Sequence, residues 1–320
     1  MKKILSITMA VILLIGLAAC KPAQGTQAAS DSGLKVVATI FPAYDFAREI
    51  GGQYVSLTML LPPGSESHGY EPTPRDMQAI AGCDVFLCIG GESEAWVDNL
   101  TASIDMEGIA MVRLIEVADH VLEEEHDHAH DGADHSDHDH DESEVIYDEH
   151  IWTSPKNALR MCTAISDAFI HADTPNADAY RTALNEYGAK LNELDAAFID
   201  IAQNAARKTL VFGDRFPLRY FEEEYGFDCH SAFPGCSVDA EPSAATVALL
   251  SRMVKEEEIP VVFYLEMSNE KMADTLIEGT TAKKRLFHSC HNVTKDEFES
   301  GASYLSLMQQ NANHVREAVQ

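Results

Sequence analysis

The sequence predicts an α/β protein of two lobes, each with a mostly parallel sheet and flanking helices, joined by one long rigid helix. Two observations carry this prediction. Short apolar strands alternate with helical segments in both halves of the chain, and this order is typical of parallel β–α–β units. Between the halves, apolar residues recur every three or four positions over 175–207, which predicts one helix about 50 Å long.

The first lobe is expected to cover 34–174. Four apolar strands are predicted in it, at 36–40, 54–62, 84–90 and 108–115. A helical stretch follows the first strand and stops at Gly51 and Gly52, because glycine is favoured just past a helix end. A second helix is predicted over 74–83, and an amphipathic helix after a short loop within 148–172.

The second lobe is expected to cover 208–320 and to be smaller. Strands are predicted at 209–214, 259–266 and 284–293, the last of which runs into a loop. Helices are predicted at 217–226, 243–258, 270–282 and 304–319. About 285 residues follow the N-terminal segment, which is enough chain for two such lobes.

The N-terminus has the pattern of an export signal with a lipid anchor. Residues 1–19 combine two lysines with a short apolar run and small residues before Cys20, which predicts a signal peptide and lipidation of that cysteine. The apolar run is shorter than the ~20 residues that span a bilayer. Residues 20–33 are small and polar and suit a flexible tether, so we expect an extracytoplasmic protein held at the cell membrane by lipid.

The net charge and the cysteine content limit the classes of partner and the kinds of covalent cross-link that the protein can have. The net charge is −29, and basic residues form no cluster, which argues against a nucleic-acid partner. Six cysteines remain besides Cys20. An exported protein can form disulfides, and sequence cannot choose among the pairings. Buried free thiols are the alternative for Cys83, Cys88 and Cys162, which lie in apolar stretches.

A segment rich in histidine and acid, at 119–144, lacks the apolar periodicity of a packed element, so we expect a surface loop without fixed structure. Six of its histidines could bind metal: His126, His128, His130, His135, His138 and His140. A flexible segment loses conformational entropy when it binds, so these sites should be weak. We therefore expect an accessory metal loop, whose deletion over 123–143 removes only weak binding.

Four other histidines lie in loops at strand ends. His68 follows the second predicted strand, His150 precedes a helix, and His288 and His291 follow the last strand. Ligands of open α/β sheets bind at the carboxyl ends of strands, and neutral imidazole is a common zinc ligand. Any one of these histidines alone is more simply a surface or hydrogen-bonded residue, but three such loops together favour a metal site. Neither the HExxH nor the GxSxG pattern of hydrolases is present.

The chain resembles the metal-binding lipoproteins of bacterial zinc and manganese ABC importers, the cluster A-I solute-binding proteins. The resemblance covers the chain from about Leu34 to the C-terminus and rests on the motifs "VVATIFPAYDFAREIGG", "LLPPGSESHGYEPTP", "EHIWTSPKNA", "YFEEEYGF" and "YLSLMQQN". It implies two lobes around a rigid long helix. It also implies that His68 and His150 are the first two metal ligands.

The remaining ligands depart from the family pattern. The resemblance implies a third ligand at Gly213, which has no side chain. Asp214 is the nearest donor, with a structural hydrogen bond to Arg215 as its alternative. The fourth ligand falls near His288, and we expect His288 and His291 together to replace the missing pair. A weaker substitute for the third ligand is His230 in "DCHSAF".

Two roles are open for the cysteine between those histidines. Cys290 could form a disulfide with Cys236 that fixes the His288–His291 loop, or it could bind zinc as a thiolate. Four imidazoles would favour Zn²⁺ over Mn²⁺, because oxygen ligands suit the harder manganese ion. Nearby carboxylates, Glu71, Asp148, Glu149 or Asp214, could hold the imidazoles.

The resemblance implies a monomeric, non-enzymatic carrier that binds Zn²⁺ and delivers it to the permease of an ABC importer. A manganese or iron carrier of the same fold is the first alternative, and an adhesin role is a possible addition. A zinc-dependent hydrolase is the alternative from another class, but it would need an activated water and a general base. The sequence offers neither a nucleophile motif nor a substrate pocket for such an enzyme.

Overall fold

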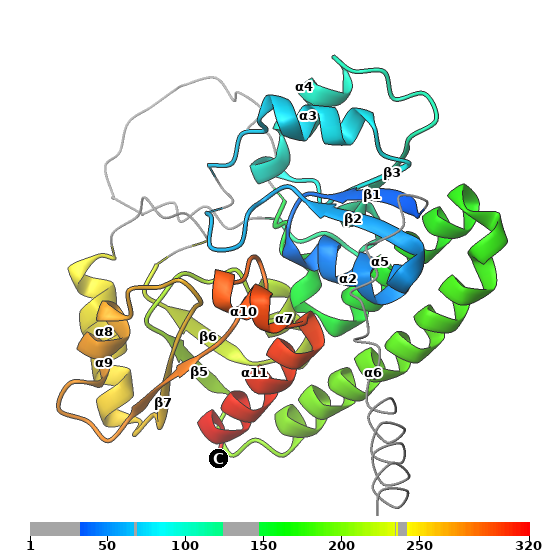
Figure 1. Cartoon of the computed structure of the whole chain (residues 1–320). Helices are drawn as coiled ribbons and strands as arrows, with labels where there is room; N and C mark the ends of the chain where they lie inside the picture. Colours follow the sequence, from blue (N-terminus) through cyan, green and yellow to red (C-terminus); the bar gives the residue numbers. More distant parts are fainter. Residues whose placement is uncertain (1–32, 67–68, 124–146, 234, 236–241) are drawn as a thin grey trace, which may run out of the picture. The chain divides into compact units, whose positions relative to one another are not determined.

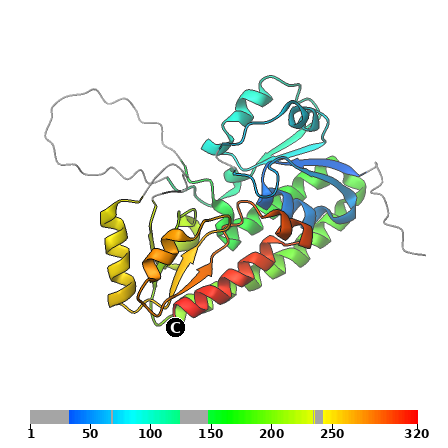
Figure 2. The same ribbon diagram turned by 60° about the vertical axis from the view of Figure 1, so that its left-hand side comes forward.

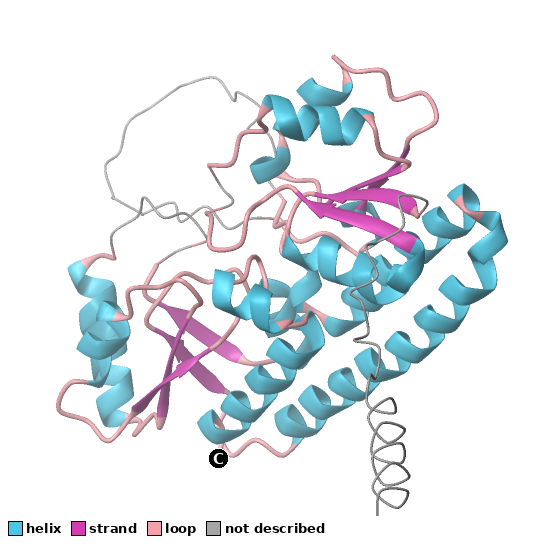
Figure 3. Ribbon diagram, viewed as in Figure 1, coloured by secondary structure: helices cyan, strands magenta, loops and turns pink. Residues whose placement is uncertain are grey.

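The computed structural model describes residues 33–66, 69–123, 147–233, 235 and 242–320. Two four-stranded parallel sheets form its framework (Figure 3). The first has the order β2-β1-β3-β4, from β1 (Leu34–Ala38), β2 (Val55–Met59), β3 (Val85–Cys88) and β4 (Ala110–Arg113). The second has the order β6-β5-β7-β8, from β5 (Thr209–Phe212), β6 (Asp228–Ser231), β7 (Val261–Tyr264) and β8 (Lys283–Leu286). The predicted fold class is confirmed.

Ten α-helices lie within the described ranges. In the first half they are α2 (Phe41–Gly51), α3 (Pro74–Ala81), α4 (Trp96–Thr101) and α5 (Pro155–Ala172). The long helix α6 covers Ala177–Gln203. The second half contains α7 (Arg219–Tyr225), α8 (Ala244–Glu256), α9 (Lys271–Ile277), α10 (Lys295–Ser300) and α11 (Tyr304–Ala318).

Both faces of each sheet are covered, which explains the nearly continuous apolar sequence of the inner strands β3, β5 and β7. Successive strand residues point to opposite faces, so Val36 joins the core shared with α6, whereas Val37 packs under α3 and α4. In the second sheet, Phe212 joins the same shared core and Val211 packs under α8 and α9. The inner faces of the two sheets therefore contribute to one continuous core.

The long helix α6 runs beside α2, α5 and α11 and contacts both halves of this core (Figures 1 and 2). Its 27 residues make a rod about 40 Å long. It is shorter than the predicted 175–207, because residues Thr174–Asn176 form a 3₁₀ turn and Asn204 ends the helix. The Asn204 side chain donates to the Asp200 carbonyl at 2.9 Å.

Three described elements were not predicted from the sequence: α4, β6 and α10. Helix α4 has only six residues, too few for a helical period to show. Strand β6 has no apolar run, since it is an edge strand of sequence DCHS. Helix α10 buries none of its residues and begins with a capping box between Thr294 and Glu297. The second sheet consequently has as many strands as the first. Within the described ranges, none of the helices is both long and apolar enough to cross a membrane.

Candidate metal centre

One carboxylate and two imidazoles lie close together, two of them in a loop of the first lobe and one in a loop of the second. Glu149 and His150 precede the short helical turn Ile151–Thr153 that leads into α5, and His291 lies in the loop after β8. One ligand atom from each of these three residues lies within 4.8 Å of the other two, and all three residues are buried. Carboxylate oxygen and imidazole nitrogen are the donors that hold Zn²⁺ in proteins.

The ring of His150 is oriented by its neighbour Asp148. The Asp148 carboxylate accepts from both the backbone N–H (2.8 Å) and Nδ1 (2.9 Å) of His150. Burial alone would raise the pKa of Asp148, but attraction to His150 and these hydrogen bonds outweigh it and lower the pKa. With Nδ1 acting as donor, Nε2 carries the lone pair that a metal would use. Asp148 is itself held by Tyr220 of α7, whose hydroxyl donates to its carbonyl at 2.7 Å.

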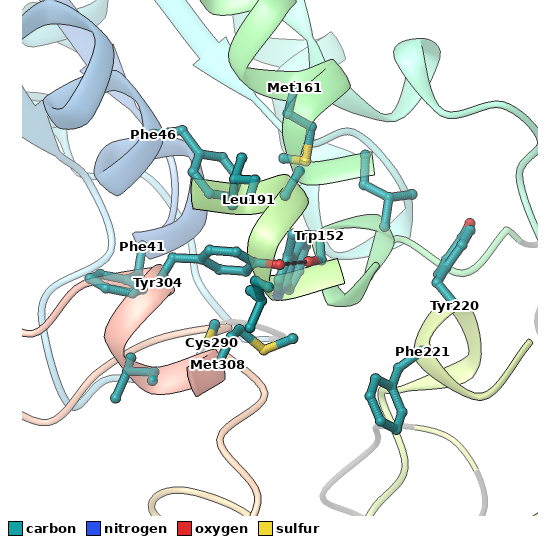
Figure 4. Close-up of a cluster of buried hydrophobic side chains, with 14 of the residues drawn as sticks. Phe41, Phe46, Trp152, Met161, Leu191, Tyr220, Phe221, Cys290, Tyr304 and Met308 are labelled. Atoms are coloured by element: carbon teal, nitrogen blue, oxygen red, sulfur yellow. Dashed lines mark hydrogen bonds between the residues drawn. The ribbon is translucent and has the colours of Figure 1, made fainter. Parts of the chain in front are cut away.

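Trp152 packs against both imidazoles. Its ring centroid lies 5.3 Å from that of His150 and 5.1 Å from that of His291, and the two histidine rings are 5.1 Å apart at 79°. The indole Nε1 donates to the Ser289 carbonyl at 2.8 Å. Trp152 is fully buried in the shared core, where its carbonyl accepts from Tyr304 of α11 at 2.7 Å (Figure 4). Trp152 therefore packs against both candidate imidazole ligands and is itself held by hydrogen bonds.

Glu149 is buried with part of its acceptor capacity unused. Its Oε2 accepts from the Ser93 N–H at 3.2 Å, whereas Oε1 has no hydrogen-bond partner among the described residues. Gly91 makes room for this carboxylate: a Cβ there would lie 2.6 Å from Oε2, and its φ is +107°. Beside it, burial raises the pKa of Glu94 to about 7, with the charge of Glu149 adding to the effect. A cation at the cluster would balance this concentration of buried carboxylates.

The structure does not bring His288 to this cluster, contrary to the sequence prediction. Cys290 has a left-handed φ of +61°, and its N–H donates to His288 Nδ1 at 2.9 Å. The other ring nitrogen, Nε2, lies 3.7 Å from Glu297 of α10 and has no hydrogen-bond partner among the described residues. The two ring nitrogens of His288 thus face Cys290 and α10. The tight turn sends His291 toward His150 and His288 toward α10.

The missing third ligand has a steric cause. A Cβ on Gly213 would lie 2.6 Å from both the backbone N and Cα of Ala273 in α9, so position 213 has no room for a side chain. Asp214 does not replace it, since its Oδ1 accepts from the Arg215 N–H (2.9 Å) and its Oδ2 from the Leu265 N–H (3.1 Å). The predicted structural alternative for Asp214 therefore fits its geometry.

Two further candidates, His230 and Cys290, are not among the residues that meet at the cluster. His230 pairs with Asp228 at 3.2 Å on β6. Cys290 is a fully buried thiol beside Met308 and is unpaired within the described ranges (Figure 4), so the disulfide with Cys236 stays a prediction. Burial raises the pKa of Cys290 well above the usual value, which disfavours the thiolate that zinc would need. Its predicted partner Cys236 lies outside the described residues.

Several other predictions also fall outside the described residues: the ligand His68, the lipidation site Cys20, and the accessory histidines at 126, 128, 130, 135, 138 and 140.

A cavity of about 30 Å³ lies beside His291, which is room for about one water. Residues of both lobes line it: Ser65, Glu66, Arg215, Glu266, Ser289 and Asn292.

Sequence reasoning proposed Glu149 only as a partner of a ligand. One signal for Glu149 was available in the sequence. It is a carboxylate directly before a candidate metal-ligand histidine, in a chain that has glycine at the third ligand position. Its direction could not be predicted, because it depends on the space left by Gly91, 58 positions earlier in the chain.

Comparison with known proteins identifies the family of this chain. The family model described as "ZnuA: Zinc-uptake complex component A periplasmic" matches residues 36–318. The chain belongs to this family. The predicted family resemblance is therefore confirmed.

Relatives of this ZnuA-family protein have names that refer to zinc. It is 29% identical over 312 residues to the high-affinity zinc uptake system protein ZnuA of Bacillus subtilis (strain 168), covering 97% of this chain and 95% of that protein. It is 28% identical over 323 residues to the zinc-binding lipoprotein AdcA of Streptococcus pneumoniae, covering 99% of this chain but only 61% of AdcA. Among solved structures, the metal-dependent lipoprotein YcdH from Bacillus subtilis matches with a TM-score of 0.74 at 27% identity, covering 90% of this chain and all of that chain.

Proposed function

We propose that this ZnuA-family protein is an extracytoplasmic lipoprotein that captures Zn²⁺ and delivers it to the permease of an ABC importer. The observation that carries the proposal is the buried cluster of Glu149, His150 and His291, whose ligand atoms lie within 4.8 Å of one another. The names of its relatives, a zinc uptake protein and a zinc-binding lipoprotein, support the same cargo.

In this proposal the ion is held by ligands from both lobes. Glu149 and His150 belong to the first lobe and His291 to the second. A predicted fourth ligand, His68, follows β2 in the first lobe. Three imidazoles and one carboxylate form a closed tetrahedral set of the kind that zinc accepts. The carboxylate offsets part of the ion's charge, which the four neutral histidines predicted from sequence would not do.

Zinc is favoured over manganese because most donors of this set are nitrogens. A manganese or iron carrier of the same fold remains the competing proposal, and it predicts a different order of affinities. Capture is favoured over hydrolysis because the relatives of this chain are named for zinc uptake and zinc binding, and its sequence has neither hydrolase motif.

The remaining parts of the proposal rest on sequence. Lipidation of Cys20 would anchor the protein at the membrane, beside the permease, and a monomer would suffice for delivery. The histidine-rich segment would raise the local zinc concentration through weak sites.

A competition titration tests the proposal. The metal-free mature chain, with Cys20→Ala to prevent lipidation, is titrated with Zn²⁺ and Mn²⁺ against a chromophoric chelator. We expect one tight zinc site and weaker binding of manganese. Tighter manganese than zinc would replace the proposed cargo.

Two variants in one loop form the matched pair for this test. His291→Ala removes a proposed ligand, and we expect zinc affinity to fall by at least 100-fold. His288→Ala removes a buried histidine of the same loop whose nitrogens face away from the cluster, and we expect less than a tenfold change. The reverse order would show that the cluster described here is not the binding site.

A further inference from the structure

The loop that carries His291 is hydrogen-bonded to the first lobe on both sides of that histidine. On the N-terminal side, the Ser289 carbonyl accepts from Trp152 Nε1 at 2.8 Å. On the C-terminal side, the Asn292 side-chain Nδ2 donates to two carbonyls of the loop after β2, those of Pro62 and Ser65, both at 2.9 Å. These bonds join residues separated by 137 to 230 positions in sequence.

Backbone and charge contacts reinforce the same junction. The Gly64 N–H donates to the Val293 carbonyl at 2.7 Å. Glu66, which follows in the same loop, lies 3.6 Å from the Arg215 guanidinium of the second lobe. The first-lobe loop Pro62–Glu66 is therefore held by the second lobe along its length.

Asn292 is at the centre of this junction and is fully engaged. It is 1% exposed. Its Oδ1 accepts from the Val293 N–H at 2.8 Å, which fixes the amide so that Nδ2 faces the two first-lobe carbonyls. An aspartate would have the same size but no donor, and alanine would leave the Ser65 carbonyl without this donor. These two hydrogen bonds are partly buried, and a partly buried carbonyl that loses its donor costs free energy, so the amide has a specific role.

The proposed metal site and this junction share one loop. His291, whose ligand atom lies within 4.8 Å of those of Glu149 and His150, is adjacent in the chain to Asn292. A zinc ion held by His291 and the first-lobe ligands would therefore link the same two lobes that the Asn292 amide links.

We propose that Asn292 is a positioning residue that couples zinc retention to contact between the lobes. It holds the Pro62–Ser65 loop of the first lobe against the loop of His291, so that the ion leaves only when these hydrogen bonds open. The proposal rests on the proposed function, because it concerns how the same ion is kept. It differs from a ligand role, since the Asn292 amide touches the loops and not the cluster.

The first test measures zinc release by the mature chain with Cys20→Ala. Zinc-loaded protein is mixed with excess chelator in a stopped-flow instrument. We expect Asn292→Ala to release zinc about tenfold faster than the parent protein, because two partly buried hydrogen bonds between the lobes are lost. Asn292→Asp should release it faster still, because its carboxylate would face two carbonyl oxygens.

The matched control is Tyr225→Phe. It removes a side-chain hydrogen bond of 2.9 Å between a buried tyrosine of α7 and Asp195 of α6. The ring of this tyrosine packs on Phe198 of α6 and Phe221 of α7. We expect it to lower the melting temperature as Asn292→Ala does while leaving the release rate within twofold of the parent. Equal release rates for Asn292→Ala and the parent would overturn the proposal. Equal acceleration by both variants would also overturn it, because destabilisation alone would then explain the effect.

A second measurement uses the parent protein alone, so its outcome does not depend on the folding of a variant. Amide hydrogen exchange at Gly64 is followed in the parent protein with and without zinc. Since this N–H is bonded across the junction to Val293, we expect zinc to slow its exchange at least tenfold. Unchanged exchange in a protein that binds zinc tightly would overturn the coupling alone. Absence of tight zinc binding by the parent would overturn the proposed function, and the coupling with it.

Discussion

Gly213 packs directly against the backbone of Ala273, so that a Cβ on Gly213 would lie 2.6 Å from the Ala273 N and Cα. This contact joins the end of β5 to α9 and closes the position where the family resemblance implies a third ligand. The ligand set of this chain must therefore be completed from elsewhere.

Restoring a histidine at this position should damage the fold rather than improve the site. We expect Gly213→His to destabilise the protein by at least 3 kcal/mol, at or beyond the upper end of ordinary overpacking, because the obstacle is backbone. Adding Ala273→Gly should give no rescue, since it removes only the Ala273 Cβ. Urea unfolding of the metal-free variants checks both, and a stable Gly213→His protein with tighter zinc binding would refute the steric explanation.

Asp148 should set the zinc affinity through His150. Asp148→Ala removes the acceptor of Nδ1, so the imidazole loses its fixed orientation, and we expect zinc affinity to fall 10- to 100-fold. Asp148→Asn retains an acceptor oxygen and should lose less. Competition titration measures both.

The control for this prediction is another pairing of aspartate with histidine, outside the cluster. Asp228 lies 3.2 Å from His230 on β6, and Asp228→Ala should leave zinc affinity unchanged. An equal loss in both alanine variants would mean that acidic charge in general, rather than the orientation of His150, controls binding.

The pairing of His288 with Glu297 should make stability depend on pH. Burial lowers the pKa of His288, but the carboxylates of Glu266 and Glu297 outweigh it and raise the pKa. The pKa of Glu297 falls to about 2, first because of His288. The ion pair therefore stabilises the fold above the ordinary glutamate pKa of about 4.3 and is lost as pH rises through the raised pKa of His288.

Glu297→Gln tests this window. The glutamine can still cap α10 but carries no charge, so we expect it to destabilise the metal-free protein by about 1 kcal/mol more at pH 5.5 than at pH 8.5. Urea unfolding at the two pH values gives the difference. A larger loss at pH 8.5 would contradict the assignment.

Deletion of residues 123–143 should leave the tight site intact, because Glu149, His150 and His291 all lie outside the deleted segment. We expect zinc titration to retain one tight site and to lose only weaker ones. Loss of the tight site would give the histidine-rich segment a primary role.

The sheets and α6 could be predicted because burial leaves a period in the sequence. Tyr187, Leu191 and Leu194 recur at helical spacing on the buried face of α6. Edge strand β6 and the exposed helix α10 bury too little to leave such a period.

The ligands were predictable by residue type and loop but not by direction. In the sequence, His288 and His291 are equally good ligand candidates, because both follow the last strand. The left-handed backbone conformation of Cys290 between them determines which imidazole ring faces the cluster. The direction of the Glu149 side chain was equally unpredictable, because it depends on the space left by Gly91, which is distant in the sequence. Such choices are made by tertiary contacts, which single-sequence patterns do not contain.

The most direct test of the central claim is a crystal structure of the zinc-loaded mature chain with anomalous diffraction collected at the zinc edge. We predict one strong peak bonded to Glu149, His150 and His291, with ligands from both lobes. A peak bonded to His288 or to the sulfur of Cys290, with Glu149 outside the coordination shell, would contradict it.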